Sequence, residues 1–178
     1  MKFRDLTKDE IDCRVQSVKP NGLVLLLYKD ARCDMNILDT TEGIGAENWQ
    51  REHYECKGNL FCRVGIKCDD EWVWKADCGV ESNTEAQKGE ASDSFKRACF
   101  NWGIGRELYT APFTWIPSEK CNITEGKNGS KQCYDKFVVE KIVIENKKIV
   151  ALAIWNTTKG CRAFSFMAEG WTPPAKAQ

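Results

Sequence analysis

The sequence predicts an α+β fold, and three stretches of the chain carry that prediction. Residues 49–80 contain short strand patterns separated by tight turns, which is typical of an antiparallel meander. The longest helical pattern follows the meander and ends close to residue 102. Residues 136–155 then have the pattern of a β-hairpin, which adds strands after the helix.

Two helices and one strand are expected before the meander. A capping box that opens at Thr7 predicts a short helix over residues 7–15. The turn signal at residues 21–22 precedes the apolar run 23–28, which predicts a strand. A second helix is expected over residues 30–41, because glycines follow it closely and stop it.

The meander and the C-terminal region supply the remaining strands. Within the meander, strands are expected at residues 49–56, 60–68 and 71–80, divided by short turns of Gly, Asn, Asp and Lys. A second capping box at residues 84–87 opens the long helix. A further strand after the C-terminal hairpin is expected at residues 161–167.

The pattern of polar and apolar segments suggests the domain organisation. We expect residues 1–116 to form one core domain. The polar residues 117–134 contain proline and glycines, and they predict a loop or an insertion. Residues 135–170 are predicted to be a β-hairpin extension that packs on this core, and residues 171–178 a flexible tail.

Charge and hydrophobicity limit the class of protein. The 178 residues include 26 Lys and Arg against 26 Asp and Glu, so a surface that binds a polyanion must gather its basic residues in one place. A hydrophobic fraction of 42% fits a globular domain, and no apolar run approaches the roughly 20 residues that a membrane helix needs. The chain starts with charged residues and shows no apolar signal segment, so we expect a cytoplasmic protein.

The ten cysteines and the single histidine do not form a metal-binding pattern. No two cysteines have the C-x-x-C spacing of structural zinc sites, and His53 has no obvious partner. We expect free thiols that pack as small hydrophobic side chains. The sequence also contains no G-x-x-x-x-G-K-[ST] loop for ATP. We therefore expect neither a cofactor nor a metal.

The long helix is predicted to have an apolar face and a cationic face. The apolar positions recur at steps of four, three and four: Ala91, Phe95, Ala98 and Trp102. Lys96 and Arg97 fall on the two sides of the opposite face, with Phe100 between them. This combination suits single-stranded nucleic acid, because cations neutralise phosphates and an aromatic ring stacks on a base for about 1–3 kcal/mol. The alternative is a solvated Lys–Arg pair with Phe100 packed on another element or a neighbouring subunit.

Three stretches of the chain resemble a known family. Residues 72–80, 82–98 and 102–109 are similar to the single-strand annealing proteins of the Rad-fifty-two superfamily, especially to its bacteriophage and prophage members. The similarity extends over roughly residues 7–116. Its most specific part is Ser-Asp-x-x-Lys-Arg-Ala at residues 92–98, followed by Trp-Gly-x-Gly. The C-terminal hairpin also looks like an addition found in phage members.

The resemblance implies a fold, an assembly and a function. The fold is an antiparallel three- to four-stranded sheet packed on a long helix, in β-β-β-α order, with an added C-terminal β-hairpin. By this resemblance, copies of the chain are expected to associate as an oligomeric ring, arc or filament, with single-stranded DNA in a continuous groove and its bases outward. The implied function is ATP-independent binding and annealing of complementary strands in phage homologous recombination and repair. Annealing breaks no covalent bond, so the protein is not expected to be an enzyme. A single-strand-binding protein or an exonuclease is a further expected partner.

The resemblance also assigns residues. The Lys-Arg pair that lines the family's DNA groove corresponds to residues 96–97, and an arginine of the first helix and a tyrosine of the next strand correspond to Arg14 and Tyr28. Phe100 stands where eukaryotic members often have a basic residue, so one phosphate contact is replaced by a ring. Lys88 and Arg106 either extend the row of positive charges on and near the long helix or are ordinary surface charges. The candidate DNA-binding residues are therefore Lys96, Arg97, Arg14, Tyr28, Phe100, Lys88 and Arg106.

Two other functions are open alternatives. A DNA-end-coating protein would use the same groove without promoting strand pairing. A metal-dependent nuclease would use Asp135 together with Glu145 and Lys147 as an E-x-K set. The last two residues fall in the turn between two predicted strands, where charged residues are common, and further carboxylates at metal-ligand spacing are missing.

Overall fold

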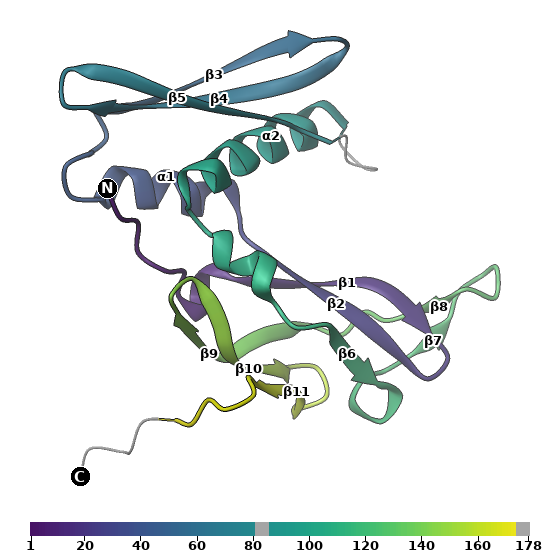
Figure 1. The fold of residues 1–178 in the computed structure, drawn as a ribbon. Coiled ribbons are helices and arrows are strands. Elements are labelled where there is room, and N and C mark those ends of the chain that lie inside the picture. Colours follow the sequence, from purple (N-terminus) through teal and green to yellow (C-terminus); the bar gives the residue numbers. More distant parts are fainter. Residues whose placement is uncertain (81–85, 174–178) are drawn as a thin grey trace. The chain divides into compact units, whose positions relative to one another are not determined.

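A computed structural model describes residues 1–80 and 86–173 of the chain, without the side chains of residues 86–88. The chain forms two compact units, and each is described here by itself (Figure 1). The first unit contains Met1–Asp5 and Lys29–Arg106, and the second contains Leu6–Tyr28 and Glu107–Gln178. The capping box expected at residues 84–87 depends on side chains outside the described set. None of the helices in the described ranges is long and apolar enough to cross a membrane.

The first unit combines two helices with a three-stranded antiparallel sheet, whose strand order is β3-β4-β5. Its elements are α1 (Ala31–Thr40), β3 (Trp49–Cys56), β4 (Asn59–Cys68), β5 (Glu71–Cys78) and α2 (Ala86–Trp102). The second helix and the three strands expected from the sequence are therefore present. Asp30 caps α1, because its side chain accepts a hydrogen bond from the Arg32 backbone N–H at 2.8 Å. The expected α+β class, with antiparallel sheets, is confirmed.

Tight turns set the register of the three-stranded sheet. Lys57 and Gly58 form the turn between β3 and β4, with φ values of 53° and 77°. Two consecutive positive φ values are the mark of the type I′ turn, whose twist matches that of the flanking strands. Asp69, with a φ of 55°, starts the turn between β4 and β5. These turns place the three strands in a simple meander.

α2 packs on one face of this sheet. Fully buried side chains alternate along β4 and recur on α2: Cys62, Val64, Ile66, Phe95, Ala98 and Cys99. At the end of α2, the Trp102 Nε1–H donates a hydrogen bond to the Val64 carbonyl oxygen at 3.0 Å. The helix is therefore held against the sheet by apolar burial along its length and by a hydrogen bond at its last residue.

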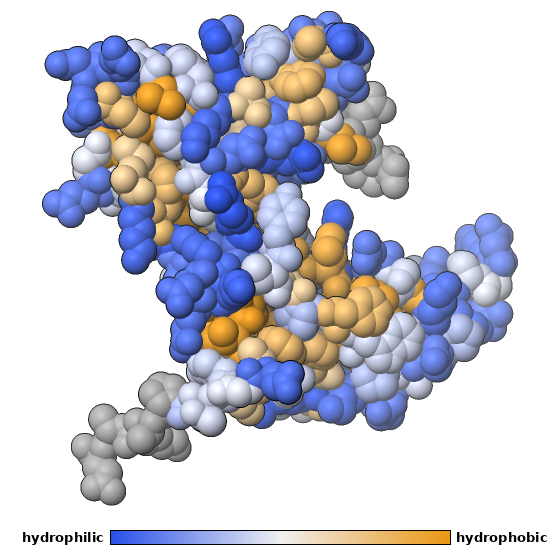
Figure 2. Space-filling model, in the orientation of Figure 1, coloured by the Kyte–Doolittle hydropathy of each residue, from blue (hydrophilic) through white to orange (hydrophobic). Residues whose placement is uncertain are grey.

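The opposite face of the sheet carries aromatic side chains, because strand residues alternate between faces. Tyr54 stacks on Phe61 with ring centroids 5.6 Å apart, and the centroids of Trp72 and Trp74 are 6.1 Å apart. Tyr54 and Trp72 both stay partly exposed. Figure 2 shows that hydrophobic residues gather in patches on the visible surface of each unit, with hydrophilic residues beside them.

The second unit is built mainly of strands. Its six-stranded sheet has the order β11-β10-β9-β1-β2-β6, and its neighbouring strands are antiparallel. The strands are β1 (Asp12–Lys19), β2 (Gly22–Tyr28), β6 (Thr114–Pro117), β9 (Phe137–Glu145), β10 (Lys148–Asn156) and β11 (Cys161–Met167). The shorter elements are the β7 (Thr124–Glu125) and β8 (Lys131–Gln132) ribbon and the 3-10 helices η1 (Lys8–Glu10), η2 (Arg106–Thr110) and η3 (Ser118–Lys120).

The prediction of a helix over residues 7–15 is wrong. Its capping box exists, because Glu10 Oε2 accepts the Thr7 backbone N–H at 2.9 Å, but the helical turn ends with η1. Asp12 then opens β1 and pairs with Tyr28 at the far end of β2. Pairing along a whole strand overrides the local helix signal, because it satisfies many backbone groups at once. Arg14 therefore lies on a strand.

The C-terminal strands form as expected. β9 and β10 make the hairpin predicted at residues 136–155, and their turn residues Asn146 and Lys147 have φ values of 50° and 61°. β11 pairs with β10 and is the further strand expected there. Residues 117–134 are more regular than a loop, because η3, β7 and β8 lie within them. β9 also pairs with β1, so segments far apart in the sequence share one sheet.

Cysteines contribute to the buried core of both units. Cys33, Cys62, Cys99 and Cys121 are buried, as expected for thiols that act as small hydrophobic side chains. Burial raises the pKa of the Cys62 thiol to about 11 and that of Cys99 well above its ordinary value. These thiols are therefore protonated at neutral pH.

Candidate nucleic-acid interface

Lys96 and Arg97 lie next to each other on α2, between residues that anchor the helix. Phe95 and Ala98, on either side of the pair, are fully buried. The expected apolar face is therefore present here, although Trp102 at its end is only half-buried. Lys96 and Arg97 are also half-buried. Side chains of this type bury their apolar stems and keep the charged group near water.

Arg97 is bound by a carboxylate of the sheet. Its Nε donates to Asp77 Oδ1 at 3.3 Å, and its side chain remains 40% exposed. An exposed ion pair contributes little to the free energy of unfolding, about 0–1 kcal/mol. The consequence of this contact is geometric, because it gives the guanidinium group a defined orientation at the surface.

A buried ion pair in the first unit supplies an acidic neighbour for Lys96. The Lys29 Nζ donates to Asp34 Oδ1, and both side chains are almost completely buried. Asp34 lies in the first turn of α1, where the helix dipole favours a negative charge. Burial raises the pKa of Asp34 to about 6, against the charges of Lys29 and Lys96, which lower it. The Asp34 carboxylate therefore acts on both cations.

Phe100 is half-buried, and its ring contacts the buried Lys29. The Lys29 Nζ lies 4.4 Å from the centroid of the Phe100 ring, which is a cation–π distance. Gly105 leaves room for this contact, because a Cβ atom there would lie 2.3 Å from Lys29 Cε. The second glycine of the Trp-Gly-x-Gly sequence is thus explained by the buried lysine. Phe100 packs on another element, as the alternative interpretation of the sequence proposed.

Of the other two basic candidates, Arg106 lies just after α2 and Lys88 lies on it. The Arg106 guanidinium donates from Nη2 to the carbonyl oxygens of Phe100 and Asn101, at 2.7 and 3.1 Å, and from Nε to that of Phe100 at 3.1 Å. Arg106 therefore caps the last turn of α2, where a cation also balances the helix dipole. The side chain of Lys88 lies outside the described set.

Arg14 and Tyr28 form a separate pair in the second unit. They lie on neighbouring strands, β1 and β2, with the Arg14 Cζ 5.8 Å from the centroid of the Tyr28 ring. Both side chains are exposed. The two strands therefore present a cation and an aromatic ring together, and this combination suits the binding of single-stranded nucleic acid.

The three residues of the nuclease hypothesis make other contacts. Asp135 accepts hydrogen bonds from the Asn122 backbone N–H at 2.8 Å and from the Asn156 Nδ2 at 2.7 Å. Glu145 accepts the Trp171 Nε1–H at 2.8 Å, and Lys147 lies 3.6 Å from Glu107. Within the described ranges, no group of three or more His, Cys, Asp or Glu residues is placed to hold a metal ion.

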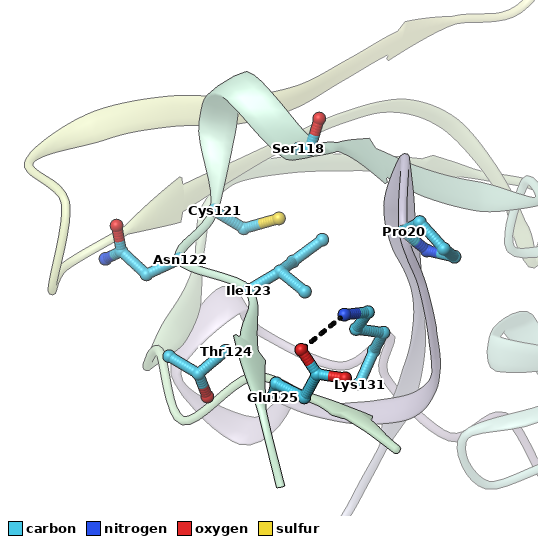
Figure 3. A pocket seen from close by; sticks show the side chains of 8 residues that line it. All are labelled: Pro20, Ser118, Cys121, Asn122, Ile123, Thr124, Glu125 and Lys131. Atoms are coloured by element: carbon cyan, nitrogen blue, oxygen red, sulfur yellow. Dashed lines mark ion pairs between the residues drawn. The ribbon is translucent and has the colours of Figure 1, made fainter. Parts of the chain in front are cut away.

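A histidine contact and a pocket of the second unit are two further features of the structure. The His53 Nε2 lies 3.0 Å from the Ala91 carbonyl oxygen, so this histidine links β3 to α2. The pocket has a volume of about 680 Å³ and lies beside η3 and β7 (Figure 3). Its charged side chains, Glu125 and Lys131, pair with each other at 3.3 Å. The pocket therefore presents little net charge to a ligand.

Three residues that contact or act on candidate DNA-binding residues were not expected from the sequence: Lys29, Asp34 and Asp77. Asp77 had a usable signal, because it follows Lys75 by two positions on a strand and both therefore face α2. Asp34 stands in the first turn of a predicted helix, a position that a surface acid occupies equally well. Nothing local distinguishes it as buried.

Comparison with known proteins places the chain in a family. The model of the Rad52/22 family double-strand break repair protein matches residues 32–128, just over half of the 178-residue chain. The match includes Lys96 and Arg97, whereas Arg14 and Tyr28 precede it. No curated protein and no solved structure matches the chain significantly. The helix, the sheet that supports it and the adjacent cations lie within the matched residues, and the chain belongs to the Rad52/22 family of double-strand break repair proteins.

Proposed function

We propose that this protein binds single-stranded DNA along α2 and anneals complementary strands. The observation that carries the proposal is the adjacent pair Lys96 and Arg97, half-buried on one helix within the residues that match the family. Two neighbouring cations replace counterions condensed on phosphates, which gives affinity without sequence preference. Arg14 beside Tyr28 is the second proposed contact, made in the other unit.

Annealing needs a strand that is held by its backbone. Lys96 and Arg97 would take phosphates, which leaves the edges of the bases free to meet a second strand. The repulsion between two backbones falls when both are near the same cations. Because no covalent bond changes, the proposed activity needs neither ATP nor a catalytic residue. The affinity for DNA should fall steeply as the salt concentration rises.

The proposal also includes an assembly and a setting. We propose that protomers associate side by side into a ring or arc, so that Lys96 and Arg97 repeat along the bound strand. The likeness of residues 72–80, 82–98 and 102–109 to bacteriophage and prophage proteins supports a phage-type member that acts in the host cytoplasm. Its partners there would be single-stranded DNA and a single-strand-binding protein or an exonuclease.

Charge reversal at α2 tests the binding surface. The double variant Lys96→Glu and Arg97→Glu should bind labelled oligo-dT at least about tenfold more weakly. The slope of log K against log salt should also become shallower by about 1.4 per protomer, because two phosphate contacts are lost. The matched control is Arg32→Glu with Lys57→Glu, which makes the same charge change at two exposed positions of the same unit. Equal weakening in both variants, each shown to be folded by circular dichroism, would refute the assignment to α2.

Strand pairing and assembly are measured separately. Two complementary labelled oligonucleotides should pair faster with the protein than without it, and without ATP. Pairing at the protein-free rate, with binding intact, would indicate the end-coating function instead. Shortening of a labelled strand only when magnesium is added would indicate a nuclease. Electron micrographs with and without oligo-dT should show curved multimers, and a monomer in both conditions would contradict the proposed assembly.

A further inference from the structure

Asp77 is a carboxylate that the protein holds in place from two elements. Its Oδ1 accepts the backbone N–H of Cys78 at 2.8 Å, which ties it to its own strand, β5. Its Oδ2 lies 3.4 Å from the Nδ2 of Asn101 on α2, and that amide also donates to the Ala76 carbonyl oxygen at 2.9 Å. Asp77 is therefore a fixed acceptor at the contact between the sheet and the helix.

Arg97 gives this acceptor only one of its three nitrogens. The Nε donates to Asp77 Oδ1 at 3.3 Å. For the terminal nitrogens, Nη1 and Nη2, no hydrogen bond occurs within the part of the chain that the structure describes, and 40% of the side chain is exposed. The end of a guanidinium group presents two parallel N–H donors, whose spacing matches two oxygens of a phosphate. Arg97 is therefore anchored at one edge and open at its end.

Other arginines of the chain are used differently. Arg63 gives both Nε and Nη2 to Glu52, at 2.9 and 2.5 Å. Arg162 gives the same two nitrogens to Glu140, at 2.7 and 2.6 Å. Arg106 donates from Nε and Nη2 to a carbonyl oxygen at the end of α2. In contrast, Arg97 makes a single, longer contact with Asp77. This contact orients the guanidinium group and leaves Nη1 and Nη2 able to donate to a ligand.

We infer that Asp77 is a positioning residue for the binding of phosphodiester groups by Arg97. The inference rests on the proposed function and deepens it. A long, flexible side chain loses conformational freedom when it binds a phosphate. Asp77 fixes that side chain beforehand, so less freedom is lost on binding. The negative charge of Asp77 would by itself repel DNA, and its net effect is favourable because the anchoring outweighs this repulsion.

Substitution of Asp77 tests the inference. Asp77→Ala should bind oligo-dT about 3- to 10-fold more weakly, because Arg97 loses its anchor. Asp77→Asn keeps an oxygen that accepts from the Arg97 Nε, so its affinity should stay within about twofold of the unsubstituted protein. Asp70→Ala removes an equal charge from the exposed turn of the same sheet, and it should leave affinity unchanged or slightly raised. Fluorescence anisotropy at several salt concentrations measures all three.

A double-substitution cycle separates positioning from a general effect of charge or folding. In a background of Arg97→Ala, the change Asp77→Ala should no longer weaken binding. The effect of Asp77→Ala should also include a salt slope lower by about 0.7, the value expected for one lost phosphate contact on a single strand. A merely structural role would leave this slope unchanged and would weaken binding equally in both backgrounds.

The outcomes distinguish this inference from the proposed function. Tighter binding by Asp77→Ala would show that Asp77 competes with phosphate, which overturns the positioning role. Unchanged affinity in a folded Asp77→Ala variant overturns that role as well, while the binding function stands. If the unsubstituted protein does not bind oligo-dT at low salt, the proposed function fails and the positioning role fails with it. Asp77→Asn keeps the oxygen that accepts the Cys78 backbone N–H and the Arg97 Nε–H and loses only the 3.4 Å contact of Oδ2 with the Asn101 Nδ2, so it remains informative if the alanine variant unfolds.

Discussion

Among the residues that the structure describes, each of the two units buries one carboxylate, and the two carboxylates are held differently. In the first unit, Asp34 pairs with Lys29, and the side chains of both residues are at most 1% exposed. In the second unit, Glu107 is fully buried, but its partner Lys147 lies 3.6 Å away and is 31% exposed. Glu107 has a second strong contact instead, because its Oε1 accepts the Leu6 backbone N–H at 2.7 Å. The first carboxylate depends on a buried cation, and the second depends on a backbone hydrogen bond.

This difference indicates what each carboxylate does. The pair of Lys29 and Asp34 lies among α1, Phe100 and Lys96, so it shapes the helix that carries the proposed DNA contacts. Glu107 joins η2 to the start of the chain, and Lys147 brings the turn of the β9–β10 hairpin to it. The first pair therefore supports the proposed binding surface, whereas the second fastens the C-terminal hairpin within its own unit. Substitutions should separate the two roles.

The largest effect is expected for Lys29→Met. This change leaves Asp34 buried without its cation, and breaking a buried ion pair from one side costs about 3–5 kcal/mol of unfolding free energy. Urea denaturation followed by tryptophan fluorescence measures the loss. Lys57→Met, at an exposed turn of the same unit, is the control and should change stability by less than about 0.5 kcal/mol. A loss of similar size in both variants would show that burial of the ion pair does not determine its contribution to the free energy of unfolding.

A smaller effect is expected for Glu107→Ala. The Leu6 backbone N–H loses its acceptor, and a buried unsatisfied donor costs about 1–3 kcal/mol. Lys147→Met removes only the half-exposed partner, so it should cost less than about 1 kcal/mol. The two variants are compared by the same urea denaturation. If the lysine substitution proved as costly as the glutamate substitution, the ion pair would be the main contact of Glu107, and the contrast between the two units would disappear.

The smallest effect concerns pH and is specific to the first unit. Burial raises the pKa of Asp34 to about 6, so the folded state binds a proton more readily than the unfolded state, where the pKa is the ordinary 3.8. Stability from this group therefore rises as pH falls through 6, by about 1 kcal/mol between pH 7.5 and pH 5. Thermal unfolding at both pH values should show this gain in the unsubstituted protein relative to Asp34→Asn. Parallel pH profiles would contradict the raised pKa.

Two other carboxylates have lowered pKa values and therefore act on stability in the opposite direction. Hydrogen bonds from Asn156 and Asn122 outweigh burial and lower the pKa of Asp135, and those from Arg162 lower that of Glu140. A group with a lowered pKa stabilises the folded state above its ordinary pKa and loses that contribution as pH falls through the folded value. These losses occur below the pH window in which Asp34 is tested.

Much of the fold was predictable because its signals are local. The turns at residues 57–58 and 146–147 have the residues that short hairpins need, and the strands beside them alternate as expected. The helix at residues 31–40 had a capping residue and glycines after it. The strand at residues 12–19 was not predictable in this way, because its capping box signals a helix and only pairing with other strands makes it a strand.

The candidate site divides in the same manner. The positions of Lys96 and Arg97 on one helix followed from helical periodicity, and both residues lie on α2. The contact of Phe100 with Lys29 was not visible, because Lys29 is 71 positions earlier and is itself a residue type that is rarely buried. Asp77 shares a strand face with Lys75, which the alternation of strand residues predicts, but its contact with Arg97 depends on a helix that comes later in the chain.

The amino-acid sequence alone determined where most helices, strands and turns occur, and it placed two cations side by side on the long helix. Those features follow from interactions between residues a few positions apart, which a periodic pattern records directly. Tertiary structure decided that residues 12–19 form a strand, that Lys29 is buried and that Asp77 holds Arg97. Each of these depends on a partner distant in the sequence, and burial or pairing with such a partner outweighs the local preference of the residue itself.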